Sequence, residues 1–564
     1  DRGRIRMDAG IYAEYTSNYR LWEGMADFAR EKGLGFQLHL SQTESEREGC
    51  LDRTGLAPAE LLNCHGVFNN KTCAVGCGYL TDQEITLLGK KHVSAVLTPE
   101  ADALKGRRTA DVVTLLKAGM NVARVNFSHG DHASHGKTID LFRGVRDAMG
   151  LSAAVMLDTK GPEIRTRDFA GGKAQLKNGE MFTLTTRDIL GDAHGCGITY
   201  ANLPQELKAG DAVLIDDGKL RLEVCETTDT DILCKIINGG QISNHKGINV
   251  PNVALSMEYL SPVDREDLLF GIKKDVDYVA ASFVRRADDV IALRKFLTEN
   301  GGGDIKIISK IENIEGIDNF EEILEASDGI MVARGDMGVE VNFARLPGIQ
   351  KRFIKRCQQS GKIVITATQM LESMIKSPLP TRAEITDVAN AVFDGSSAVM
   401  LSGETAMGAY PVEAVAAMAK IAMQAEQDDP RFLPGGNMWY EMDSSDTTNA
   451  VGHAACTLAR DINAKAIMSI TKSGYTALRM SKFRPATMLI AATPHEKTYH
   501  QMALIWGVYP LMVENLQNVD VLVYRCLEEG RKVGLLASGD KVVISAGVPL
   551  DITGKTNMIR VEFA

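Results

Sequence analysis

Three short motifs that identify common enzyme classes are missing from this chain of 564 residues. It contains no G-x-x-x-x-G-K-[ST] loop, no H-E-x-x-H helix and no G-x-S-x-G turn. The first absence excludes nucleotide phosphate binding of the P-loop type. The other two remove common signatures of zinc proteases and serine esterases.

Long hydrophobic runs and an excess of basic residues are missing as well. The longest apolar runs have the length of strands, so we expect no membrane span, and no signal-peptide pattern is present. With 63 Lys and Arg against 73 Asp and Glu, the net charge of −10 argues against nucleic-acid binding, which relies on basic surfaces. The ten cysteines are scattered, which favours a reducing, cytoplasmic location.

One group of these cysteines allows two interpretations. Cys64, Cys73 and Cys77 lie near His65 in the sequence and could bind a metal ion. Their spacing fits no common zinc pattern, however, which favours buried free thiols.

What the chain does contain is a series of apolar runs rich in Val and Ile, the pattern of parallel strands buried on both faces. Helical patterns lie between them, for example at Ala287–Glu299 and Leu346–Gln359. Eight such units predict a (β/α)8 TIM barrel of the α/β class. The expected strands are Val93–Leu97, Val122–Phe127, Ala153–Asp158, Val276–Phe283, Ile305–Ile311, Gly329–Ala333, Ile363–Thr368 and Ala398–Ser402.

Two regions depart from this rhythm. Between Lys160 and Val276, Gly and Asp separate short alternating segments, which predicts an inserted β-barrel domain placed to act as a lid. A polar stretch from Gln424 to Asp446 then precedes a predicted C-terminal α/β domain. Its expected strands are Ala466–Ile470, Met488–Ala491, Tyr509–Met512, Lys541–Ser545 and Ile559–Phe563.

Polar residues follow three of the barrel strands. Lys310 and Glu312 lie at the end of one strand, Asp336 follows the next, and Thr368 follows the one after that. Parallel barrels keep their chemistry at the carboxyl ends of the strands, so we expect these side chains to converge. Glu312 and Asp336 are hard oxygen ligands suited to Mg²⁺ or Mn²⁺, and Lys310 could stabilise a phosphoryl group during transfer.

The second and third strands end in further oxygen donors. Asn126 and Ser128 share one side of the second strand with Arg124, while Asp158 and Thr159 end the third. These four oxygen donors could bind a weakly hydrated monovalent cation, or they could form a hydrogen-bonded network without an ion. Arg124 could contact phosphate oxygens.

A turn in the C-terminal domain is a second candidate site. Thr471-Lys472-Ser473-Gly474 follows a strand and precedes a helix. Such a turn can hold a phosphate through backbone N–H groups, and it can equally be an ordinary capped turn.

From about Val93 to its end, the chain resembles the pyruvate kinase family. The resemblance rests on nine strings that follow one another in order. They are N-V-A-R-V-N-F-S-H-G (121–130), L-D-T-K-G-P-E-I-R-T (157–166), K-G-I-N-V-P (246–251), A-A-S-F-V-R (280–285), I-S-K-I-E-N (308–313), M-V-A-R-G-D-M-G-V-E (331–340), T-A-T-Q-M-L-E-S-M (366–374), P-T-R-A-E (380–384) and M-L-S-G-E-T-A (400–406).

This resemblance implies phosphoryl transfer from phosphoenolpyruvate to ADP, giving pyruvate and ATP in glycolysis. It also implies a homotetramer, Mg²⁺ or Mn²⁺ as cofactor, and K⁺ dependence through Glu163 in the G-P-E string.

The implied catalytic residues are Lys310, Thr368 and Arg124, and the substrate-binding residues are Lys310, Gly335, Asp336 and Thr368. The implied nucleotide-binding residues are Arg124, His129, Arg165 and Lys246. The implied ligands are Glu312 and Asp336 for Mg²⁺, and Asn126, Ser128, Asp158 and Thr159 for K⁺. A sugar-phosphate effector would bind Thr471, Lys472, Ser473, Gly474 and Thr476.

The N-terminal part resembles a different family. Residues 11–97 are similar to part of an amidohydrolase of the methylthioadenosine/S-adenosylhomocysteine deaminase type, through strings at 35–46, 55–62 and 80–85. Of the metal ligands that this family needs, His39 remains, Gly76 stands where a second His is required, and the others are missing. Catalytic zinc takes about three protein ligands, so we expect a remnant without deaminase activity.

The predicted domains are a partial amidohydrolase-like segment (1–92), the barrel (93–161 and 258–430), the inserted domain (162–257) and a regulatory α/β domain (431–564). Two alternatives stay open. The chain could be an inactive fusion relic, because the stretch from His92 to Pro99 keeps the apolar strand and the proline of the family's first strand but lacks its basic start and its glycine. It could also be another phosphoenolpyruvate-type barrel enzyme, such as a lyase or mutase, although Lys310 and the two extra domains argue against this.

Overall fold

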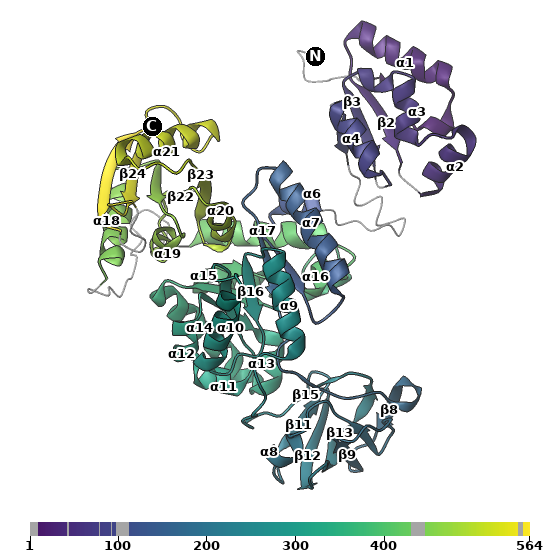
Figure 1. Ribbon diagram of the computed structural model, residues 1–564, viewed down its shortest axis with the longest axis vertical. Coiled ribbons are helices and arrows are strands. Elements are labelled where there is room, and N and C mark those ends of the chain that lie inside the picture. The colour runs from purple at the N-terminus through teal and green to yellow at the C-terminus, as the bar shows by residue number, and fades with distance from the viewer. Residues whose placement is uncertain are drawn as a thin grey trace. The chain divides into compact units, whose positions relative to one another are not determined.

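The structure is a computed structural model that describes residues 9–41, 44–77, 79–91, 93–96, 112–429, 446–550 and 556–564. The chain divides into two compact units, Asp1–Ala110 and Asp111–Ala564, and each has hydrophobic cores of its own (Figure 1). No helix in these ranges is long and apolar enough to cross a membrane.

The N-terminal unit contains a four-stranded parallel sheet in the order β1-β2-β3-β4. Along β2, Phe36, Leu38 and Leu40 are buried while Gln37 and His39 are more exposed, which is the alternation expected of a sheet covered on one face. The strands are β1 (Ala9–Gly10), β2 (Phe36–Leu40), β3 (Thr72–Gly76) and β4 (Ser94–Val96). The helices are α1 (Tyr19–Lys32), α2 (Glu44–Thr54), α3 (Pro58–Cys64) and α4 (Asp82–Lys90).

Strand β4 corrects one prediction. Val93–Leu97 was expected to open the barrel, but Ser94–Val96 pairs in parallel with β3 of the N-terminal unit. His92 and Leu97 lie outside the described residues. The physical reason is local connectivity: β3, α4 and β4 follow one another as a β-α-β unit, and consecutive strands of this kind usually pair or lie close together. A short apolar strand carries no information that would direct it to a more distant sheet.

The other seven expected barrel strands are present and form one parallel sheet. Its order is β20-β19-β18-β17-β16-β6-β5, so within the described ranges β5 and β20 are its edges. The strands are β5 (Val122–Asn126), β6 (Ala154–Asp158), β16 (Tyr278–Ala281), β17 (Lys306–Ile311), β18 (Gly329–Ala333), β19 (Ile363–Ala367) and β20 (Ala398–Val399). The α/β barrel class is confirmed, with seven strands described in place of the eight expected.

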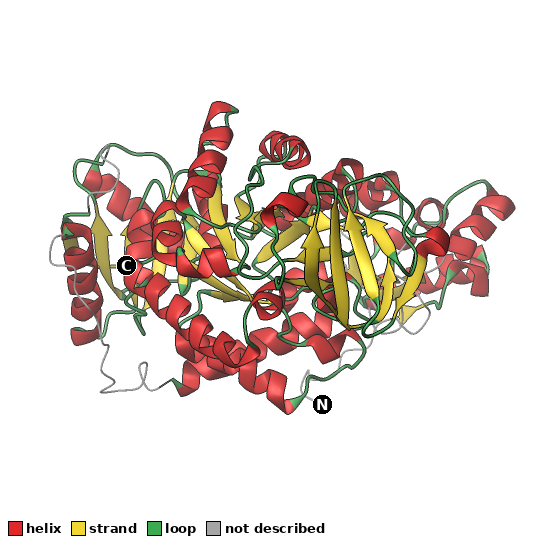
Figure 2. Ribbon diagram, turned by 90° about the horizontal axis from the view of Figure 1, so that it is seen from below, coloured by secondary structure: helices red, strands yellow, loops and turns green. Residues whose placement is uncertain are grey.

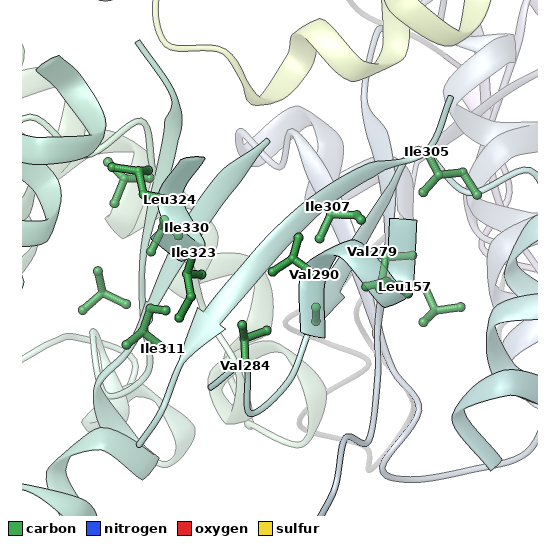
Figure 3. Close-up of a cluster of buried hydrophobic side chains, with 14 of the residues drawn as sticks. Leu157, Val279, Val284, Val290, Ile305, Ile307, Ile311, Ile323, Leu324 and Ile330 are labelled. Carbon is green, nitrogen blue, oxygen red and sulfur yellow. The ribbon is translucent and has the colours of Figure 1, made fainter. Parts of the chain in front are cut away.

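Helices flank these strands, as the red and yellow ribbons of Figure 2 show. Between sheet and helices lies a core of branched side chains, in which Val279 and Ile307 of the sheet pack with Val290 and Ile323 of two helices (Figure 3). The helices are α6 (Val112–Ala118), α7 (His132–Ala148), α9 (Pro262–Lys273), α10 (Ala287–Glu299), α11 (Ile314–Asp318), α12 (Phe320–Ala326), α13 (Arg334–Glu340), α14 (Leu346–Ser360), α15 (Arg382–Asp394), α16 (Gly403–Ala406) and α17 (Pro411–Asp428).

The inserted region is mostly β, with the short helix α8 (Leu203–Glu206) and a 3-10 turn at Ala170–Gly172, and it has a separate core. Its main sheet has the order β10-β9-β13-β12-β11-β15-β7, and β14 pairs with β8. These strands are β7 (Ile164–Arg165), β8 (Lys173–Leu176), β9 (Met181–Thr185), β10 (Gly195–Gly197), β11 (Ala212–Ile215), β12 (Leu220–Thr227), β13 (Asp231–Asn238), β14 (Gly240–Ser243) and β15 (Gly247–Asn249).

All five strands predicted for the C-terminal domain are present, in the order β23-β22-β21-β24-β25 with β25 antiparallel. They are β21 (Ala466–Ile470), β22 (Met488–Thr493), β23 (Val508–Met512), β24 (Lys541–Ala546) and β25 (Met558–Phe563). The helices are α18 (Thr447–Asp461), α19 (Tyr475–Ser481), α20 (Glu496–Gln501) and α21 (Val519–Lys532).

Helix α20 contacts the barrel where β16 begins. The hydroxyl of Tyr278 donates a hydrogen bond to the carbonyl of Gln501 (2.5 Å), and the Gln501 side chain donates to the carbonyl of Asp277 (3.1 Å). The C-terminal domain is therefore bonded directly to a barrel strand that ends among the predicted site residues.

Candidate active site

The carboxyl ends of neighbouring parallel strands bring five predicted residues close together. Arg124 of β5 forms an ion pair with Asp158 of β6, and Lys310 of β17 forms ion pairs with Asp158 (3.2 Å) and Glu312 (3.0 Å). Asp336, in the first turn of α13, interacts with both Lys310 and Glu312. This is the convergence that the barrel geometry predicts.

Lys310 is buried at the centre of this group and stays charged. Burial works against an ammonium, but the carboxylates of Asp158 and Glu312 outweigh it, so the pKa of Lys310 is raised. A surface salt bridge, the ordinary role of a lysine, is excluded because the residue is only 9% exposed. The result is a fixed positive charge in buried surroundings, where the dielectric constant is lower than in water.

Glu312 and Asp336 form a pair of carboxylates that resist ionisation. Burial raises the pKa of Glu312 to about 7, although Lys310 and the backbone N–H of Phe283 (2.6 Å from Oε2) favour the charged form. Burial also raises the pKa of Asp336, and the charges of Asp217 and Glu163 add to it. Two buried carboxylates of this kind fit a divalent cation, whose charge would favour their ionised form. No group of three His, Cys, Asp or Glu side chains suited to a metal occurs in the described part of the chain, so other positions would fall to substrate and water, as Mg²⁺ prefers.

The four oxygen donors predicted to bind K⁺ lie on two adjacent strands. Asn126 and Asp158 are partners in the register of β5 and β6, and Ser128 donates its N–H to Asn126 Oδ1 (3.1 Å). Thr159 is buried and donates to the carbonyl of Ala280 through its backbone N–H (3.0 Å). Burial would raise the pKa of Asp158, but Lys310 and Arg124 outweigh it and hold the pKa below its usual value.

Thr368 and Gly335 are joined directly. The N–H of Gly335 donates to Thr368 Oγ1 (2.8 Å), and that hydroxyl donates to the carbonyl of Ala367 (2.7 Å). Thr368 has a φ of 68°, a left-handed conformation that costs a β-branched residue energy. Arg334 supports it by donating to the carbonyl of Thr368 and by an ion pair in which its Nη1 contacts both carboxylate oxygens of Asp387 (2.7 and 2.8 Å).

Sequence analysis missed three functional neighbours: Arg334, Ser282 and Phe283. Arg334 and Ser282 occur inside strings that resemble the family, but nothing in their chemistry distinguished them from ordinary residues. Phe283 contributes a backbone N–H, which no side-chain pattern can reveal.

The remaining predicted nucleotide residues have partners of their own. Arg165 pairs with Glu163 (2.6 Å), and Lys246 pairs with Asp216 (2.7 Å). His129 is exposed and accepts a hydrogen bond at its carbonyl from His135 (2.7 Å). Among the described residues, no hydrogen bond or ion pair connects Arg165, Lys246 or His129 with Lys310.

The turn of the C-terminal domain lines a surface pocket. Thr471, Lys472, Ser473 and Thr476 are among its lining residues, and so is Glu514. Gly474 has a φ of 78°, which lets the chain turn into α19.

In the N-terminal unit, the three cysteines of the suggested cluster are free thiols, but Cys64 is exposed and Cys73 and Cys77 are half-buried, so the predicted burial is wrong for Cys64. All ten cysteines are free, and burial raises the pKa of Cys77 to about 12. His65 contacts Glu23 (2.9 Å) instead of a cysteine, and His39 stacks on Tyr12 with ring centres 4.6 Å apart.

Comparisons with known proteins agree with this architecture. The family described as "Pyruvate kinase, barrel domain" matches residues 90–415, and "Pyruvate kinase, alpha/beta domain" matches residues 449–562. The amidohydrolase family matches residues 2–165, which overlaps the start of the barrel match.

Similar proteins include pyruvate kinases of three bacteria. That of Clostridium acetobutylicum is 48% identical over 80% of this chain and 96% of its own length, and that of Clostridium perfringens is 46% identical over 79% and 95%. That of Staphylococcus haemolyticus is 46% identical over 79% and 77%. The crystal structure of a pyruvate kinase from Cryptosporidium parvum matches with a TM-score of 0.74 and 39% identity, covering 80% of this chain and 92% of that one.

Proposed function

The chain belongs to the pyruvate kinase family and transfers the phosphoryl group of phosphoenolpyruvate to ADP, and from this premise we propose that Lys310 is the central catalytic residue. The observation that supports this role is its buried ammonium, held between the carboxylates of Asp158 and Glu312. A fixed, buried cation stabilises charge as it develops on a phosphoryl group, without having to reorganise first.

We propose that Glu312 and Asp336 hold Mg²⁺ or Mn²⁺. Support comes from their burial and from the raised pKa of each carboxyl group. When bound there, the ion would supply positive charge to the phosphoryl oxygens.

K⁺ is the proposed second ion, with Asn126, Ser128, Asp158 and Thr159 as its ligands. The register of β5 and β6 supports this assignment, because it sets Asn126 beside Asp158. Glu163, in the G-P-E string, marks the K⁺-dependent members that the chain resembles.

The remaining roles follow the same resemblance. Thr368 is the proposed neighbour of the enolate carbon, and its hydrogen bond with Gly335 supports a shared substrate site. Arg124, His129, Arg165 and Lys246 are the proposed contacts of the nucleotide. The pocket around Thr471, Lys472, Ser473, Gly474 and Thr476 is the proposed site of a sugar-phosphate effector, since its turn offers N–H and hydroxyl donors.

We further propose a homotetramer in the cytoplasm, with an inserted domain at 162–257 and a regulatory domain at 431–564. The boundary predicted at residue 92 conflicts with the pairing of β4 with β3, because this pairing places Ser94–Val96 in the sheet of the N-terminal unit. The N-terminal unit is proposed to descend from an amidohydrolase of the methylthioadenosine/S-adenosylhomocysteine deaminase type and to lack deaminase activity, because His39 is the single ligand-type residue left of that family's metal site.

A coupled assay tests the whole assignment. Purified full-length protein with Mg²⁺ and K⁺ should form ATP from phosphoenolpyruvate and ADP, and Lys310→Ala should not. Loss of phosphoenolpyruvate without ATP would indicate a lyase or mutase, and a folded but inert protein would indicate a fusion relic.

A further inference from the structure

We propose that Ser282 is a positioning residue, whose hydroxyl aims the ammonium of Lys310 at the phosphoryl group. This inference rests on the role proposed above for Lys310. Ser282 lies just beyond the carboxyl end of β16, next to β17, and its side chain is buried.

The direction of its hydrogen bonds follows from chemistry. Lys310 Nζ lies 2.8 Å from Ser282 Oγ, and an ammonium can only donate, so the hydroxyl oxygen is the acceptor. The hydroxyl hydrogen must then point elsewhere, and its two acceptors are the carbonyl of Thr159 (2.7 Å) and Oδ1 of Asp158 (3.1 Å). Ser282 thus joins Lys310 to the residues at the end of β6.

Ser282 differs from the other two partners of Lys310 in charge. An ammonium has three hydrogens, and the acceptors within reach are Asp158, Glu312 and the Ser282 hydroxyl. The two carboxylates attract the lysine strongly but also neutralise its charge. The neutral hydroxyl fixes the direction of a flexible four-carbon side chain without cancelling the positive charge that the phosphoryl group needs.

The serine is itself held on several sides. Its N–H donates to Thr159 Oγ1 (3.1 Å), and its carbonyl accepts from the hydroxyl of Tyr259 (3.1 Å). A Cβ added at Gly161 would lie 3.0 Å from Ser282 Cβ, so the backbone there packs tightly against it. Side chains held in this way can place a partner to within the small tolerance that catalysis requires.

The next residue extends the same arrangement. Phe283 has a φ of 53°, a strained left-handed conformation for a bulky residue, and its N–H donates to Glu312 Oε2. Consecutive residues after β16 therefore hold Lys310, near the end of the neighbouring strand β17, and Glu312, the residue that follows this strand.

A purely structural role is the competing explanation, and the chain offers a matched control. Ser309 is equally buried, directly precedes Lys310, and bonds through its hydroxyl to the hydroxyl of Ser327 (2.6 Å) rather than to Lys310. Ser309→Ala therefore removes a buried seryl hydroxyl from β17, the strand that carries Lys310, without removing a hydrogen bond of the lysine.

The experiment compares kinetics and thermal melting of Ser282→Ala, Ser282→Cys and Ser309→Ala in the full-length protein. We expect kcat to fall about 10- to 100-fold in both Ser282 variants, with KM for phosphoenolpyruvate within about twofold of the parent, since a hydrogen bond to a charged group is lost. Ser282→Cys keeps the shape of the side chain and replaces the hydroxyl oxygen with a larger, weakly accepting sulfur, so it serves if the alanine variant folds poorly. Ser309→Ala should keep its kcat even if its melting temperature falls.

Two results would overturn the inference. One is a kcat in the Ser282 variants that equals that of Ser309→Ala. The other is a loss of kcat that merely follows the loss of thermal stability across all three variants. Lys310→Ala separates this failure from a wider one: a folded, active Lys310→Ala would overturn the proposed function, whereas an inactive one beside normal Ser282 variants would overturn only the role of Ser282.

Discussion

Lys310 and Asp158 are 152 residues apart in the sequence, yet their side chains meet at 3.2 Å in the interior of the barrel. The contact joins two groups of predicted residues, since Asp158 belongs to the proposed K⁺ ligands and Lys310 to the phosphoryl-transfer residues. Each keeps the other charged despite burial: the pKa of the lysine is raised and that of the carboxyl group is lowered.

Lys310→Ala should lower kcat by at least about 10²–10³-fold, because it removes the cation nearest to the moving charge. Lys306→Ala, at the other end of the same strand, should leave turnover near that of the parent. The measurement is ATP formation by folded protein, with folding checked by circular dichroism. Near-normal turnover in Lys310→Ala would contradict the assignment.

Glu312→Gln and Asp336→Asn should each raise the Mg²⁺ concentration needed for half-maximal activity. The amide keeps the shape of the carboxylate but removes the charge that attracts the ion. Glu315→Gln, whose parent side chain pairs with Arg286, is the matched control. If both variants kept the parent's metal requirement, the ligands would lie elsewhere.

The raised pKa of Glu312 predicts a pH effect on stability. Without divalent ions, the folded state holds a proton on Glu312 up to about pH 7, while the unfolded state releases it near pH 4.5, the ordinary pKa of a glutamate. Between these values the unfolded chain binds fewer protons, so rising pH destabilises the parent relative to Glu312→Gln. The difference in melting temperature should grow from about pH 4.5 to 7 and then level off. A difference independent of pH would contradict the burial of an ionisable group there.

Activity should require K⁺, and Glu163→Lys should weaken that requirement by placing a fixed ammonium near the proposed cation site. In the parent, Glu163 pairs with Arg165, so the substitution also removes that ion pair, while Arg165 keeps its hydrogen bond to the carbonyl of His245. Glu180→Lys, the same change in charge at an exposed position of the inserted domain, is the control. Equal parent rates in K⁺ and in a bulky organic cation would refute the requirement.

Removal of residues 1–110 should leave phosphoryl transfer intact. Every proposed site residue lies in the unit Asp111–Ala564, and β4 pairs with β3 rather than with a barrel strand. The full-length protein should also fail to deaminate methylthioadenosine when zinc is added. Loss of kinase activity in a folded truncation would mean that the barrel needs the strand around Ser94–Val96 after all.

Most of the barrel could be predicted from the sequence because strand-length apolar runs and the polar residues after them are local signals. Lys310 and Glu312 were found in this way. The pairing of Ser94–Val96 could not be predicted, since such a short strand fits more than one sheet edge. The short connection through α4 determines that it pairs with β3. Ser282 was missed because its importance comes from the neighbouring strand, and Phe283 because it acts through its backbone.

Strand β16 connects the C-terminal domain with the proposed active site. At its start, Tyr278 is hydrogen-bonded to Gln501 of the C-terminal domain, and Ser282, just after its end, is hydrogen-bonded to Lys310. A change in the path of the chain at Gln501 would therefore act on the strand that ends beside Lys310. A chimaera that takes its C-terminal domain from another relative must preserve the path of the chain at Gln501, because the hydrogen bond uses the main-chain carbonyl and not a side chain that could be restored by substitution.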